Sequence, residues 1–384
     1  GRDGAGRDDL EGEVAGLGVI VQTETADPGR RAHGQGRSIH GRAPTRRRPT
    51  HQLLSTMVSS SIQARRATCP PHRNSHSAER SANLPAMDVW LLWAMRVGWV
   101  MLPLVGGPSV TAALGDGATG TTATALAWVA FGLGLVAMAV PRTLPLTMLR
   151  VVVPASVPFA VFTVVRTDAE AGSVIMLVLA VLVTVLAMLA DIGNLFADGS
   201  SYGPERRMLL RPPAAVMIGA VPAAWVVLVV GVVAPPLLLA DGRWIVGILA
   251  AVVGIPAAFF LFVALHRLTQ RWLVFVPAGL VIVDHTTLTD PVLVRSEVID
   301  VIGPAVVGAS EGMTDLTADA AGLVLSITTD QPLVIARVTA GEEPTVTEST
   351  TGVLVSPSRP GAMLAEAESR GLPVGQPRPT QPNS

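Results

Sequence analysis

The stretch Ser173–Ala190, SVIMLVLAVLVTVLAMLA, contains no charged residue and only two hydroxyl-bearing side chains, Ser173 and Thr184. Its apolar residues follow one another instead of alternating with polar ones, so the pattern favours a helix over a barrel strand. A hydrocarbon core of about 30 Å requires about 20 apolar residues as a helix, which also satisfies its own backbone polar groups. The stretch therefore predicts a transmembrane helix.

Similar composition recurs along residues 87–269. The chain is 49% hydrophobic and 15% charged, with a mean hydropathy of +0.49, whereas soluble domains carry roughly 25% charged residues. The prediction is a transmembrane bundle of six helices, at 89–107, 123–140, 146–165, 173–190, 214–239 and 244–265.

Arg96 interrupts the first of these spans, and an arginine at mid-bilayer costs roughly 2.5–3.5 kcal/mol on insertion scales. Two alternatives remain open. The span shifts toward Leu114 and leaves Arg96 near the cytoplasmic face, or Arg96 is a buried charge in a substrate pathway.

The arginines near the span ends predict orientation. If six spans alternate, the connections at 141–150, at 191–213 and directly after 265 face one side of the membrane and carry Arg142, Arg150, Arg206, Arg207, Arg211, Arg267 and Arg271, whereas the opposite side has only Arg166 and Arg243. The positive-inside rule then places both termini in the cytoplasm of a multi-pass protein of the cell (plasma) membrane.

Three of these arginines crowd the stretch 201–213, SYGPERRMLLRPP, which is expected to be a cytoplasmic loop. Topology alone explains their charge. A second interpretation is that Arg206, Arg207 and Arg211 hold anionic lipid headgroups, at about 1 kcal/mol per basic residue near the surface.

Residues 1–86 are rich in Gly, Arg, Ser, His and Pro and are expected to be disordered, because they offer too little apolar surface to offset the entropy of ordering. An alternative is that Met87 is the natural start and that the preceding residues over-extend the gene. Cys69, His72 and His76 have the side chains for a metal site, but no scaffold to preorganise them is apparent, so no metal is predicted.

After Arg271 the sequence changes character, and residues 270–375 predict a small cytoplasmic β-rich domain. Residues 272–284 indicate a strand, a Pro-Ala-Gly turn and a second strand, rich in branched side chains. Residues 322–338 indicate another hairpin, with Thr-Asp-Gln-Pro as its turn. A strand is expected at 352–357, a closing helix from Pro360 to Arg370, and a disordered tail at 376–384.

The layout resembles uncharacterised actinobacterial multi-pass membrane proteins with a C-terminal bacterial pleckstrin-homology-like (PH-like) domain. The residues that carry the resemblance are the Trp272–Asp284 hairpin, the Asp290-Pro291-Val292 step with Ile299 and Ile302 beyond it, and the closing SPSRPGAMLAEAESRG. The resemblance implies a PH-like fold but no activity. Because the first hairpin has almost no basic residue, lipid-headgroup binding by the domain itself is not expected.

Two patterns suggest chemistry. Gly199–Gly203 matches G-x-S-x-G, with Ser201 as nucleophile and His266 or His285 as partners, but the motif requires a strand before the serine and a helix after it. The acids Asp315, Asp319, Glu342 and Glu343 could coordinate a divalent cation, yet they are spaced as ordinary loop acids. Neither pattern is taken as a site.

All 28 basic residues are arginine, so the chain has no lysine for a Walker A loop or a Schiff base. The sequence therefore predicts a non-enzymatic integral membrane protein without catalytic residues, cofactor, metal or nucleic-acid partner. Its partners would be the lipid bilayer and, through 270–375, other proteins or further copies of the chain. The alternative is a membrane transporter or channel.

Overall fold

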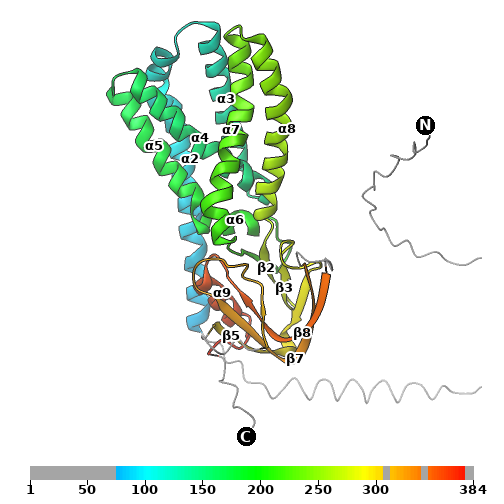
Figure 1. Cartoon of the computed structure of the whole chain (residues 1–384). Helices are drawn as coiled ribbons and strands as arrows, with labels where there is room; N and C mark the ends of the chain where they lie inside the picture. The colour runs from blue at the N-terminus through cyan, green and yellow to red at the C-terminus, as the bar shows by residue number, and fades with distance from the viewer. Residues whose placement is uncertain (1–74, 306–311, 339–344, 377–384) are drawn as a thin grey trace, which may run out of the picture. The chain divides into compact units, whose positions relative to one another are not determined.

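The structure is a computed structural model that describes residues 75–305, 312–338 and 345–376, with side chains from Val89 onward except at Thr345 and Val346. Within these ranges six helices are long and apolar enough to cross a membrane, which confirms the expected number. Figure 1 shows them gathered in one bundle. They are α2 (Ser75–Leu114), α3 (Ala118–Ala139), α4 (Thr143–Arg166), α5 (Ala171–Met188), α7 (Val221–Ala240) with the π-helical turn Val216–Ala220 before it, and α8 (Trp244–Leu268).

The first span runs from Val89 to Leu114, past the expected end at residue 107. Because the span continues to Leu114, Arg96 lies farther from that end than the middle of the span, as the shifted alternative expected. Nη2 of Arg96 donates a hydrogen bond to the carbonyl of Met138, 2.6 Å away near the end of α3. The guanidinium group as a whole lies over the ring of Trp93. The charge is therefore held at one end of the bundle by a helix terminus and an aromatic face.

Small residues let the helices approach closely. A Cβ on Gly231 of α7 would lie 2.7 Å from the carbonyl oxygen of Gly254 on α8, so the two backbones touch at this crossing. Helices α2 to α5 share one core, which includes Met95, Trp99 and Leu146, while Leu228 and Ala258 join the α7–α8 pair to α4 at Val151.

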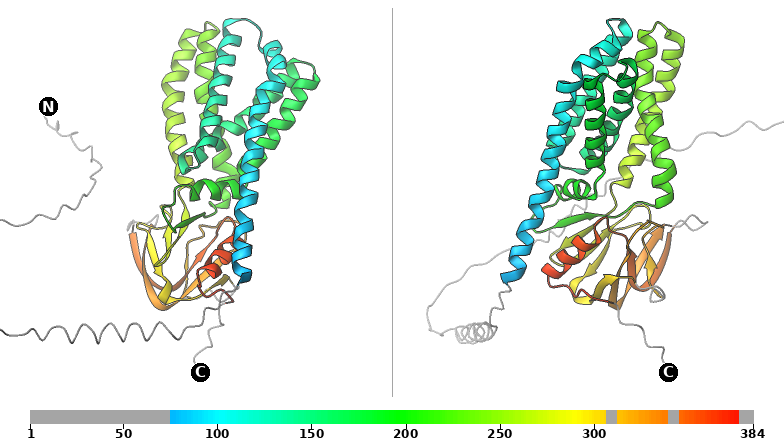
Figure 2. Two further views of the ribbon diagram at one scale, coloured as in Figure 1. Left: turned by 180° about the vertical axis from the view of Figure 1, so that it is seen from behind. Right: turned by 90° about the vertical axis from the view of Figure 1, so that its left-hand side faces the viewer.

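The β-rich region has two four-stranded sheets. The first has the order β1-β2-β3-β4 and is antiparallel throughout: β1 (Arg206–Leu209), β2 (Trp272–Val276), β3 (Gly279–Val283) and β4 (Val292–Arg295). The second has the order β5-β7-β8-β6: β5 (Ile299–Pro304), β6 (Thr314–Asp315), β7 (Leu325–Val338) and β8 (Thr345–Val355). Helix α9 (Pro360–Ser369) follows, and its Met363 and Ala367 belong to the core of the β module. The two views in Figure 2 show the helix beside the strands of this module.

The β2–β3 hairpin is confirmed, with Val276 opposite Gly279 across the Pro277–Ala278 turn. Gly279 has a φ of +143°, and a Cβ there would collide with the carbonyl of Val294 on β4, so only glycine suits the position. The closing helix is also confirmed, from Pro360 to Ser369 with Arg370 as its C-cap.

The hairpin predicted at 322–338 is wrong. Residues 325–338 form the single strand β7, which follows β8 along its length with a register shift between Thr328 and Leu333. Pro332 cannot donate a ladder bond, and Thr329 Oγ1 donates to the carbonyls of Gln331 and Thr351 instead. The Asp-Gln-Pro step therefore produces a bulge and not a turn.

The stretch 191–213, expected to be a loop, contains two elements. Helix α6 (Ala190–Asp198) follows α5, and β1 joins the first sheet beside β2, although more than sixty residues separate the two strands in the sequence. The β module thus takes one strand from the segment that connects two membrane spans.

Candidate functional site

The two cores of the protein meet at β1 and β2. Because side chains alternate along a strand, Leu209 and its partner Trp272 face the core of the helix bundle, whereas Met208 and Leu273 face the core of the β module. One layer of sheet is therefore shared by two hydrophobic cores. The β module cannot turn relative to the helix ends without exposing Leu209.

Helix α6 supplies the polar contacts of this junction. Asn194 Oδ1 accepts from the backbone N–H of Leu209 at 2.8 Å and from Ser358 Oγ at 3.1 Å, and Asp191 pairs with Arg359 at 2.9 Å. Asp198 Oδ1 accepts from the N–H of Arg207 at 3.0 Å. Asp198 and Asn194 thus accept from two N–H groups of β1 that β2 does not pair, and Asp191 ties α6 to the residue before α9.

The three predicted lipid-contact arginines have partners within the protein. Arg206 lies 3.8 Å from Glu366 of α9, Arg207 stacks over the ring of Trp272, and Arg211 Nη1 donates to the carbonyl of Ala321 at 2.9 Å. Arg206 and Arg207 are neighbours on one strand and so point to opposite faces of the sheet. The structure does not gather the three into one patch, and a role in lipid contact stays a prediction.

Sequence reasoning missed a buried ion pair at the point where α8 leads into β2. Arg271 Nη2 donates to Asp284 Oδ2 at 2.7 Å, and both side chains are almost fully buried. Nη1 donates to the carbonyl of Arg211 at 3.0 Å, and Thr286 and Thr287 donate to the carboxylate. Burial alone would raise the pKa of Asp284, but the hydrogen bond and charge of Arg271, with Thr286, lower it below its ordinary value.

The other candidate residues do not converge. Ser201 Oγ donates to Asp198 Oδ1 in the turn after α6, so a helix and not a strand lies directly before it. His266 lies in α8 beside Thr147 and Thr269, and His285 follows β3. The geometry required of the G-x-S-x-G motif is therefore not present here.

The metal candidates are not assembled either. Asp315 Oδ1 accepts from the N–H of Thr317, as in an ordinary turn. Among the residues that the structure describes, no three His, Cys, Asp or Glu side chains are grouped as metal ligands. Glu342, Glu343, Cys69, His72 and the side chain of His76 lie outside the described part.

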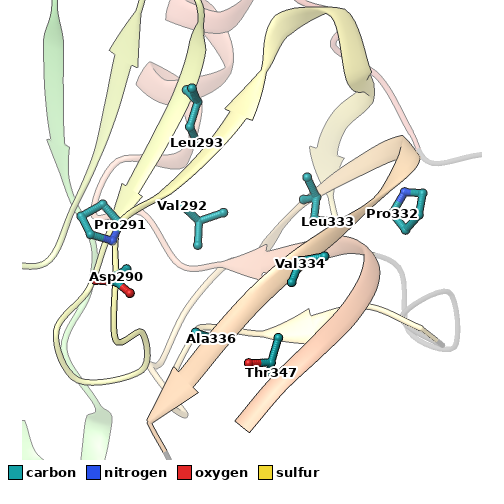
Figure 3. Close-up of a pocket in the computed structure, with 9 residues that line it drawn as sticks. All are labelled: Asp290, Pro291, Val292, Leu293, Pro332, Leu333, Val334, Ala336 and Thr347. Carbon is teal, nitrogen blue, oxygen red and sulfur yellow. The ribbon is translucent and has the colours of Figure 1, made fainter. Parts of the chain in front are cut away.

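A groove opens between the two sheets on the far side of the module from the junction strand β1. Its volume is about 380 Å³, and Figure 3 shows Val292 and Leu333 approaching it from opposite walls. The lining residues are Asp290, Pro291, Val292 and Leu293 from β4 and its approach, Pro332, Leu333, Val334 and Ala336 from β7, and Thr347 from β8. Apart from Asp290 and Thr347, all of these side chains are apolar.

Comparisons with protein-family models, curated proteins and solved structures yield no match to this chain. What defines the described part of the chain is its architecture, six apolar helices with a β module of two sheets and a closing helix.

Proposed function

We propose that this is a non-enzymatic integral membrane protein whose cytoplasmic β module mediates assembly or contacts with partner proteins. The observation that carries the proposal is the shared sheet, in which Leu209 and Trp272 belong to the helix core and Met208 and Leu273 to the module core. A module fixed in this way presents the same surfaces at the membrane at all times. Such preorganisation lowers the entropy cost of binding a partner.

The orientation is part of the proposal. The loops on the side of the module carry most of the arginines between the spans, so the positive-inside rule favours a cytoplasmic module and cytoplasmic termini in the cell membrane. A PH-like identity for the module is likewise proposed, on the resemblance of its sequence and on its two sheets with a C-terminal helix.

Cross-linking in intact cells followed by extraction in mild detergent tests the function. Specific complexes or homo-oligomers should be recovered with the full chain and lost when residues 270–375 are deleted. Deletion of residues 1–74 is the matched control and should leave the complexes intact. Both deletions must remain in the membrane fraction after alkaline washing. Complexes that persist without residues 270–375 would contradict the proposal.

Transport is a second candidate because of Arg150, in the membrane span α4. Its Nε is buried without a hydrogen-bond partner within the described residues, and its guanidinium lies against Gly193 of α6. Leu209 of β1 lies against the same glycine, so the guanidinium is near the module end of the bundle. Unpaired charges within membrane helices commonly mark an ion or substrate path. Liposomes containing the protein should then show anion flux that Arg150→Met abolishes and Arg142→Met, the control at the helix end, does not.

A further inference from the structure

The groove between β4 and β7 is bordered by backbone groups without partners. At one end the two walls pair: the N–H of Thr289 donates to the carbonyl of Ala336 and the N–H of Val338 to the carbonyl of Thr287, each at 3.0 Å. Within the described ranges no ladder joins β4 to β7 beyond this point. The direction of each remaining donor follows from strand alternation.

Backbone groups of every second residue point to the same side of a strand. Val334 precedes Ala336 by two residues, so its N–H and C=O point into the groove. On the other wall the N–H of Ser296 donates to Ala278, on the side of β3, so the groups of Leu293 and Arg295 point away from β3. Both walls therefore present unpaired strand edges.

Two prolines explain why the walls do not close on each other. Pro291 lies two residues before Leu293, and Pro332 lies two residues before Val334. Each proline therefore occupies a position at which the N–H of another residue would have faced the groove. Proline at such positions protects a strand edge from unwanted pairing. The protection is partial, because Leu293, Arg295 and Val334 keep their donors.

The side chains around these edges are apolar and accessible. Val334 is 70% exposed and Leu293 is 43% exposed. Exposed aliphatic side chains beside a free edge are the combination that binds an extended peptide, since main-chain bonds supply affinity and alternate side chains supply selectivity.

Charge indicates the kind of occupant. Residues 270–384 contain 13 Asp and Glu and 6 Arg, a net charge of 6 − 13 = −7. Of the residues that line the groove only Asp290 is charged, and it is exposed. Arg337, the neighbour of the lining residue Ala336, lies 3.6 Å from Glu348. A second copy of residues 270–384 would bring the same acidic surplus, so electrostatics disfavour pairing of two modules and favour a basic segment.

We infer that the groove binds an extended, basic segment of a partner protein, with alternating aliphatic side chains, as an added strand on the edge of β4. The inference rests on the proposed function and names its partner class.

The test uses the full chain in nanodiscs and a fluorescent seven-residue peptide that alternates valine with arginine and threonine. Leu293→Pro removes one groove-facing donor without touching the ladder to β3, and should weaken binding about tenfold, equivalent to about 1.4 kcal/mol. Leu293→Thr keeps the donor and should bind within about twofold of the wild type. Val334→Pro and Val334→Thr form a second pair if Leu293→Pro fails to fold.

Two control peptides separate the contributions of charge and backbone. Glutamate in place of arginine should abolish binding, and so should methylation of every backbone nitrogen. Hydrogen exchange should slow at Leu293 and Arg295 when the arginine peptide binds. Equal binding by Leu293→Pro and Leu293→Thr, or unchanged exchange at these amides, overturns the inference.

Other occupants give distinct results. Binding only to a chain that starts at Met87 would mean that the chain's own N-terminal segment occupies the groove. Dimers dispersed by the peptide would mean that a second copy does. Both results overturn the inference but leave the proposed function standing. A third result would be that deletion of residues 270–375 abolishes all complexes while Leu293→Pro retains them fully. The module would then act through a surface other than the groove, and the inference would be overturned.

Discussion

Arg271 is expected to be the residue on which the β module depends most. Its side chain is 1% exposed and connects three segments, through Asp284 Oδ2 at 2.7 Å, the carbonyl of Arg211 at 3.0 Å and that of Leu316 at 3.4 Å. Removing one partner of a buried pair costs about 3–5 kcal/mol, because the other charge is left uncompensated. Thr286 and Thr287 still donate to Asp284, so we expect Arg271→Met to cost about 3 kcal/mol, the lower end of that range.

The assay is thermal unfolding of the full chain in detergent, followed by protease sensitivity of the module. A loss of about 3 kcal/mol corresponds to a fall in Tm of at least about 12 °C for a module of about 100 residues. Asp284→Leu should cost a similar amount. The double variant Arg271→Met with Asp284→Leu should be destabilised by less than the sum of the two, since no lone charge remains. The reasoning would be refuted if the destabilisations of the two single variants simply added in the double variant, or if Arg271→Met lowered the Tm by less than about 2 °C.

Three further results are expected. Because Arg271 and Thr286 hold the pKa of Asp284 below its ordinary value of 3.8, the contribution of Asp284 to stability is complete above that pH and is lost as pH falls through the lower pKa of the folded state. In Arg271→Met burial dominates and raises the pKa of Asp284, so the difference in Tm from the wild type should narrow from pH 7 to pH 5; a widening difference contradicts this. Asn194→Ala leaves the N–H of Leu209 unpaired and should destabilise the junction by about 1–3 kcal/mol, which would be measured as faster hydrogen exchange in β1. Asn194→Asp keeps an acceptor at this position, so exchange in β1 should match that of the wild type. With Cys69 replaced by serine, Asp116→Cys should react with an impermeant maleimide on intact cells and Asp330→Cys only after permeabilisation; the reverse pattern would invert the topology.

Short-range features were predictable. Ser173–Ala190 predicts its helix from composition and length, and the structure places α5 at Ala171–Met188. The Pro277–Ala278 turn and the Gly371 stop likewise predict the first hairpin and the end of α9, because turn and cap preferences depend on a few adjacent residues. The same local rule failed at Asp330–Pro332, where pairing with β8 overrides the turn signal and makes one bulged strand.

The candidate sites were harder to predict from the sequence. Arg206 and Arg207 were visible as charges, but no local pattern marks RRML as a strand, since two arginines obscure the alternation and the partner strand begins at Trp272. The Arg271–Asp284 pair gave a weak signal only, as an arginine and an aspartate that bracket a strongly apolar hairpin. The groove gave none, because it depends on which strand edges are left unpaired.

Composition and periodicity thus determined that the described part of this chain has six helices long and apolar enough to cross a membrane, followed by a β module, since the transfer of apolar side chains out of water depends on the residues themselves. Only the tertiary structure decided that β1 belongs to that module, that Leu209 and Trp272 join it to the helices, and that Leu293 and Val334 keep free backbone groups. Those outcomes are pairings between distant segments. Their free energy depends on what each strand finds beside it, which the order of residues along the chain does not specify locally.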